Sequence, residues 1–116
     1  MHYNISVRLF TAGKCFGPGM AALLSLVRER HSLRAAAAEM GMAYSKAWRI
    51  IRTAEGVFGC KLLASTIGGQ HGGGAVLTEQ AQRLLGAYDA YCADVQSYSQ
   101  SRFEAAFGFY RDLEKE

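Results

Sequence analysis

Apolar residues between positions 32 and 58 recur at the spacing of two helices separated by a turn. The apolar positions of the first helix are Leu33, Ala36, Ala37 and Met40, and those of the second are Tyr44, Ala47, Trp48, Ile51 and Phe58. Ser32 is placed to cap the first helix, and Gly41 suits a left-handed turn after it. Because Ala37 and Gly41 let the two helices pack closely, the pattern predicts a helix-turn-helix.

The second of these helices has a polar face without an acidic residue. This face consists of Ser45, Lys46, Arg49, Arg52 and Thr53, spaced i, i+1, i+4, i+7 and i+8. Lysine and arginine bind phosphates or guanine edges, and hydroxyl groups bind base edges or phosphates. The face therefore favours contact with DNA. On this segment alone, the alternative is an ordinary helical hairpin with a solvated basic face.

The residues before the helix-turn-helix predict one strand, one loop and one helix. Apolar and polar side chains alternate over Tyr3–Phe10, which is typical of a short amphipathic strand. Glycines punctuate Thr11–Gly19, which is therefore expected to be a loop. Pro18 is placed to open a helix, and Met20–Arg30 has apolar residues at helical spacing.

A glycine-rich stretch follows the helix-turn-helix. It joins two short predicted strands, Lys61–Thr66 and Ala75–Leu77, into a hairpin, as in the wing of a winged helix. Gln70 and His71 lie at the tip, where backbone N–H groups can approach a phosphate or a minor groove. The stretch disfavours a nucleotide-binding loop, because it lacks a Lys-Ser/Thr ending and leads into a strand. A hairpin tip without a DNA contact remains the alternative.

The last predicted helix is long and carries an aromatic stripe. Thr78 is placed to cap it, with Glu79 in the first turn. The stripe, which repeats at about 3.5 residues, predicts a dimer interface made by Leu84, Tyr88, Tyr91, Val95 and Tyr98. Alternatively, residues 103–116 fold back onto their own domain. The expected organisation is a winged helix-turn-helix over residues 1–78 and a dimerisation helix over residues 79–116 of the same domain.

Composition limits the class of protein. The chain has 116 residues, half of them hydrophobic, which fits one globular domain of mainly α structure with a small β component. It lacks an apolar run of membrane-spanning length and a signal peptide, so a cytoplasmic protein without a membrane partner is expected. The three cysteines are far apart, and no histidine spacing suggests a metal site. We predict neither a metal nor another cofactor.

Catalysis is not expected either. No nucleophile–base pair or paired carboxylates are concentrated at one place, so no catalytic residue is predicted. Glu39 and Glu55 are expected on solvated faces of their helices.

The charge is distributed unevenly along the chain. Residues 28–61 hold seven lysines and arginines and three glutamates, a balance of +4, whereas residues 78–116 have a balance of −3. One region is therefore suited to phosphate and the other is not.

Several motifs together resemble a known family. They are GPG at 17–19, GMAYSKAW at 41–48 and STIGGQHGGGAVLT at 65–78. They look like the N-terminal DNA-binding domain of the ModE family of molybdate-responsive regulators, relatives of the LysR-type winged helix, over about residues 5–100. The resemblance implies a dimeric transcription regulator with Trp48 in the core. With the polar face and the wing tip, the residues expected at DNA are Arg34, Tyr44, Ser45, Lys46, Arg49, Arg52, Thr53, Gln70 and His71.

The chain also departs from that pattern. Ala43 stands where the family often has serine, and Ala64, Gln70 and His71 stand where basic residues are frequent, which predicts weaker non-specific binding. Members of the family append a molybdate-binding module, whereas this sequence ends at Glu116. We expect either a stand-alone regulator or a DNA-binding half, without a small-molecule effector site. The alternative function is a winged helix that binds another protein and not DNA.

Overall fold

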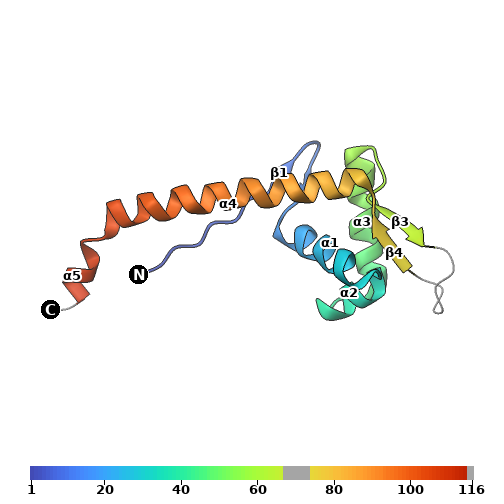
Figure 1. The fold of residues 1–116 in the computed structure, drawn as a ribbon, viewed down its shortest axis with the longest axis horizontal. Coiled ribbons are helices and arrows are strands. Elements are labelled where there is room, and N and C mark those ends of the chain that lie inside the picture. Colours follow the sequence, from blue (N-terminus) through green and yellow to red (C-terminus); the bar gives the residue numbers. More distant parts are fainter. Residues whose placement is uncertain (67–73, 115–116) are drawn as a thin grey trace.

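The computed structural model describes residues 1–66 and 74–114. In chain order the elements are β1 (Leu9–Phe10), β2 (Lys14–Phe16), α1 (Pro18–Arg30), α2 (Leu33–Glu39), α3 (Tyr44–Phe58), β3 (Leu63–Thr66), β4 (Gly74–Leu77), α4 (Glu79–Phe107) and α5 (Tyr110–Glu114). Helices α1 to α3 form a compact head with the β3–β4 hairpin at its side, and α4 runs across this head and far beyond it (Figure 1). The predicted fold class, mainly α with a small β component, is confirmed.

The helix-turn-helix forms from the local signals in the sequence. The Ser32 hydroxyl accepts a hydrogen bond from the backbone N–H of Ala35 at 3.0 Å and so caps α2. Gly41 follows α2 with φ +69°, a conformation that a side chain would disfavour. Ala37 and Ala47 are almost fully buried, so α2 and α3 approach closely without a large side chain between them.

The wing is an antiparallel pair of strands with a regular register. Leu63 pairs with Leu77 at its base, and Thr66 pairs with Gly74 at the last described position. A Cβ atom at Gly74 would overlap Oγ1 of Thr66, so a larger residue here would force the Thr66 side chain to move. The predicted hairpin is confirmed as far as it is described. Its tip, which includes Gln70 and His71, lies outside the described residues.

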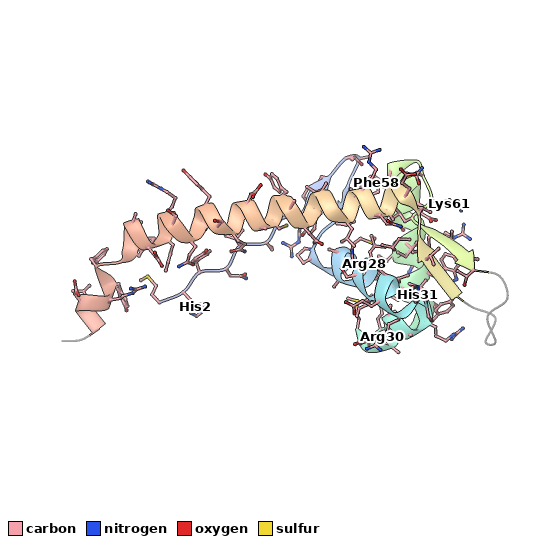
Figure 2. All side chains as sticks on the ribbon, in the orientation of Figure 1. His2, Arg28, Arg30, His31, Phe58 and Lys61 are labelled. Carbon is pink, nitrogen blue, oxygen red and sulfur yellow. The ribbon has the colours of Figure 1, made fainter. Side chains whose placement is uncertain are left out.

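Backbone hydrogen bonds fix the base of the wing to the head. His31 ends α1 in the left-handed conformation, and its carbonyl accepts from the N–H of Ala75 in β4 at 3.0 Å. Figure 2 shows His31 next to the helices and the wing. Thr78 caps α4 by accepting from Ala81 N–H, and its hydroxyl donates to the carbonyl of Lys61 at 2.7 Å. The wing is therefore held in a defined position beside α3.

Glu55 makes a further connection, and the prediction that it lies on a solvated face is wrong. Its residue is only 9% exposed, and its carboxylate accepts the backbone N–H of Leu62 at 2.8 Å. Lys61 lies 3.9 Å away from the same carboxylate. The chain turns back at Gly59 after α3, and this turn brings the N–H of Leu62 over the last turns of the helix.

We expect Glu55→Ala to lower the free energy of unfolding by about 1–3 kcal/mol, because the buried Leu62 N–H loses its acceptor. Urea unfolding followed by circular dichroism measures this change. Glu55→Gln keeps an acceptor oxygen and should lose less stability than the alanine variant. Equal stability of all three proteins would show that the carboxylate is not a structural acceptor.

The N-terminal region differs from the prediction. The expected strand over Tyr3–Phe10 is wrong in extent, since only Leu9–Phe10 pairs, and it pairs with β2 inside the predicted loop. The preceding residues lie instead along α4, and side chains of α4 donate hydrogen bonds to backbone carbonyls of this segment. Tyr88 donates its hydroxyl to the carbonyl of Val7 at 2.7 Å, and Gln96 donates to that of Ile5 at 3.3 Å. The period-two alternation of burial persists because the segment remains extended.

The core lies where α1, α3 and the first turns of α4 meet. Its largest fully buried side chains are Phe16, Leu23, Leu24, Val27, Ile51, Leu62 and Leu85. The ring of Phe16 packs edge-to-face against Tyr88 at a centroid distance of 4.9 Å. Burial, together with the neighbouring Cys92 thiol, raises the pKa of the Tyr88 phenol. The hydroxyl therefore stays protonated at neutral pH and remains the donor to the N-terminal segment.

The second half of α4 projects away from this core. The radius of gyration is 18.3 Å and the longest extent is 63 Å. A compact domain of this length would have a radius of gyration of about 13 Å. Residues 103–114 lie at the far end of α4, away from the head (Figure 1). Across residues 1–66 and 74–114, none of the helices has the length and hydropathy that a membrane span requires.

Candidate nucleic-acid interface

One face of α3 is exposed, polar and basic. Ala47, Ile51 and Ala54 are buried against the head. The residues on the opposite side are all exposed, and they are the predicted set Ser45, Lys46, Arg49, Arg52 and Thr53. Helical geometry places Arg49 near the centre of this outward face, about 180° from the buried stripe. The structure thus brings the five predicted residues of α3 together on one surface.

The N-terminus of α3 strengthens the positive potential of this face. Ala43 occupies the capping position and offers no side-chain hydrogen bond, and the first turn holds no acidic residue. The first backbone N–H groups of the helix therefore remain without a side-chain acceptor. This end of a helix carries a partial positive charge, which favours a phosphate or another anion.

Some basic residues of this region form ion pairs with carboxylates, and others do not. Arg30 forms a two-pronged ion pair with Glu39, with N–O distances of 3.0 and 3.1 Å. The hydrogen bond to this carboxylate raises the pKa of Arg30. Among the residues that the structure describes, no carboxylate forms an ion pair with Lys46 or Arg49. The positive charge of α3 therefore faces solvent uncompensated.

Two arginines stack on aromatic rings at the side of α3 that faces the wing. The guanidinium of Arg34, from α2, lies 4.2 Å from the ring centroid of Tyr44. That of Arg52 lies 4.8 Å from the ring of Trp48. The two rings pack edge-to-face, 6.5 Å apart. This arrangement joins Arg34 to the predicted surface.

The prediction that Trp48 lies in the core is wrong, because 37% of it is exposed. The physical reason is that the buried stripe of α3 is narrow and consists of Ala47, Ile51 and Ala54. Trp48 lies at the edge of this stripe, so it is only partly covered. It is therefore part of the candidate interface.

Arg8 is a further candidate residue that the sequence did not indicate. A hollow of about 410 Å³ lies on the other side of α3, between this helix and the start of α1. Its lining includes Arg8, Phe16, Met42, Arg49, Ile50 and Thr53. Arg8 lies 41 positions before Arg49 and is not among the residues predicted at DNA. No local pattern indicates that the fold places these two arginines beside one hollow.

The predicted dimerisation residues lie in different environments. Tyr88 is only 6% exposed and belongs to the core of its own domain, and Leu84 is half-buried against that core. Val95 is also half-buried, near the N-terminal segment. Tyr91 and Tyr98, by contrast, are 57% and 70% exposed on the projecting part of α4. In Figure 2 the side chains of this part stand out on several sides of the helix.

A helix-turn-helix with an exposed basic second helix and an adjoining two-stranded wing defines the winged-helix class of DNA-binding domains. Residues 19–82 match the model of the bacterial regulatory helix-turn-helix proteins of the lysR family. The chain belongs to this family.

The most informative relatives are larger regulators and binding proteins. The chain is 35% identical over 89 residues to the molybdenum-pterin-binding protein MopB of Rhodobacter capsulatus, covering 77% of this chain and 33% of MopB. It is 35% identical over 90 residues to the DNA-binding transcriptional dual regulator ModE of Escherichia coli K12, covering 77% of this chain and 34% of ModE. The chain thus spans about a third of the length of these relatives. The resemblance to the ModE DNA-binding domain is confirmed.

Proposed function

We propose that this chain binds specific sites in double-stranded DNA as a homodimer and thereby regulates transcription. The observation that carries this proposal is the exposed, uncompensated basic face of α3 with a wing fixed beside it. In this arrangement α3 enters the major groove, where Lys46 and Arg49 contact phosphates and base edges. The wing lies along the adjacent groove. Membership of a family of regulatory proteins supports the same function.

Dimerisation through α4 completes the proposal. The projecting half of this helix exposes Tyr91 and Tyr98 and lies outside the head. A second copy that packs on this half buries both rings and relates two α3 helices by two-fold symmetry. Such a dimer recognises a site made of two related half-sites. One relative is named a molybdenum-pterin-binding protein, so genes of molybdenum uptake and use are the first expected targets.

Selection of genomic DNA tests this function. The purified protein is incubated with fragmented genomic DNA at two salt concentrations, and the retained fragments are sequenced. We expect a motif with two-fold symmetry that persists at the higher salt. Retention without sequence preference that disappears at the higher salt contradicts specific binding. Absence of retention at both salt concentrations favours a winged helix that binds another protein. The exposed aromatic side chains of α4 would then contact that protein.

Arg8 is expected to contact a phosphate next to the residues of α3. Arg8→Ala should weaken binding to all DNA sequences alike and reduce the slope of log K against log salt by about 1.8 per dimer, the value of one phosphate contact in each protomer. Fluorescence anisotropy on specific and random duplexes at several salt concentrations measures both effects. Arg83→Ala, which removes an exposed arginine from the first half of α4, is the matched control. A slope equal to that of the wild type would exclude Arg8 from the interface.

A further inference from the structure

A narrow groove separates α3 from the wing. Its volume is about 210 Å³, and its lining includes Leu33, Tyr44, Trp48, Leu63, Ala64 and Ser65. The lining is mixed, with slightly more polar than apolar accessible surface, and Trp48 and Tyr44 provide the wall on the side of α3. Among the residues that the structure describes, no ion pair crosses the groove. Strands β3 and β4, which form its other wall, contain no charged residue.

The geometry of DNA determines what passes between a helix in the major groove and a wing in the next minor groove. These two grooves are separated by the sugar–phosphate backbone of one strand. If α3 and the wing occupy adjacent grooves of the DNA, the backbone of that strand must lie against the floor of the protein groove between α3 and the wing. The apolar side chains of this mixed lining suit the deoxyribose rings, and its hydroxyl and backbone groups can bind phosphate oxygens. The phosphates also require cations at the sides.

The stacked arginines provide these cations. Arg34 lies over Tyr44 at 4.2 Å, and Arg52 lies over Trp48 at 4.8 Å, so both guanidinium groups are held against the aromatic wall. A guanidinium fixed on a ring loses less conformational entropy when it binds than a free one. A guanidinium that stacks on a ring face keeps the N–H donors at its edge available to a phosphate.

We propose that this groove seats the backbone of one DNA strand and that Trp48 is a positioning residue for the phosphate contact of Arg52. The deoxyribose rings lie against Trp48 and the β3 side chains, while Arg34 and Arg52 bind successive phosphates. This inference rests on the proposed function, because it assigns one part of the same DNA interface. It adds a backbone site that lies between α3 and the wing.

Substitutions at Trp48 and Arg52 test the coupling between the two residues. The proteins are Trp48→Leu, Trp48→Phe, Arg52→Gln and the double variant Trp48→Leu/Arg52→Gln, each titrated with a selected duplex at several salt concentrations. Trp48→Leu should reduce the salt slope by about 1.8 per dimer, as Arg52→Gln does, because the cation loses its support in each protomer. Trp48→Phe retains a ring and should keep the wild-type slope. The double variant should show one lost contact per protomer and not two.

Two outcomes overturn the proposal while leaving DNA binding intact. One is a wild-type salt slope for Trp48→Leu when the wild-type protein binds DNA. A fall in the thermal unfolding temperature of the same variant would then indicate a structural role for Trp48. The other outcome is a full second loss of slope in the double variant. Failure of the wild-type protein itself to bind any duplex contradicts the proposed function instead.

Discussion

Replacement of both Lys46 and Arg49 by alanine is expected to weaken DNA binding by at least about thirtyfold. A side-chain contact to a base or to its flanking phosphate contributes about 1–3 kcal/mol, so two contacts contribute about 2 kcal/mol or more. Both side chains are exposed and lie on the outward face of α3, so their removal should not disturb the core. Anisotropy titration with a selected duplex measures the loss, and circular dichroism verifies that the fold is retained.

A charge-matched variant separates the interface from a general electrostatic effect. Arg28→Ala/Arg83→Ala also removes two positive charges, but from exposed positions on α1 and α4. This control should bind the selected duplex nearly as the wild type does. Equal losses in the two double variants would indicate non-specific attraction of a basic protein to DNA. Wild-type affinity of the α3 variant would favour the protein-binding alternative.

The fold was predictable where its signals are local. A serine three residues before the N–H that it caps and a glycine in the left-handed turn define the two helices of the helix-turn-helix. The spacing of small and apolar residues on α3 also identifies the exposed basic face, since burial of one stripe fixes the opposite side. The base of the wing follows from glycines between two short apolar runs.

Long-range contacts account for what the sequence analysis missed. Periodicity marked Trp48 as a core residue, yet the width of the buried stripe depends on how closely α1 and α2 pack on α3. Glu55 was predicted on a solvated face because its hydrogen-bond donor, the N–H of Leu62, lies beyond the end of its helix. Arg8 reaches the side of α3 only because β1 and β2 fold its segment there. Each case depends on a neighbour that helical spacing does not reveal.

The N-terminal segment shows how the same pattern can belong to two structures. Alternating exposure over residues 3–9 fits a strand in a sheet, and it fits equally an extended chain that lies on a helix. Here Tyr88 and Gln96 of α4 bind carbonyls that a neighbouring strand would otherwise bind. Tyr3 continues this contact, with its ring 4.8 Å from that of Phe103. The segment thereby covers one side of α4 and leaves the side of Tyr91 and Tyr98 uncovered.

Replacement of Tyr91 and Tyr98 by glutamate is expected to convert a dimer into a monomer. The two residues are seven positions apart and share one face of α4, where both rings are largely exposed. Charges placed on this face oppose the burial that dimerisation requires, and glutamate is compatible with a helix. Sedimentation equilibrium measures the change in mass. Binding to a two-half-site duplex should fall by about 10² to 10⁴-fold, because the second half-site is no longer bound by a linked copy.

The neighbouring positions provide a matched control for this result. Ala90 and Ser97 have the same spacing and are also exposed, but they lie about 100° around the helix from the two tyrosines. Ala90→Glu/Ser97→Glu adds the same charge and should remain dimeric. A single half-site duplex should bind both double variants as it binds the wild type, since each α3 helix is unchanged. Dissociation of both variants would place the interface elsewhere on α4, and a dimer that survives the tyrosine substitutions would contradict the proposed α4 interface.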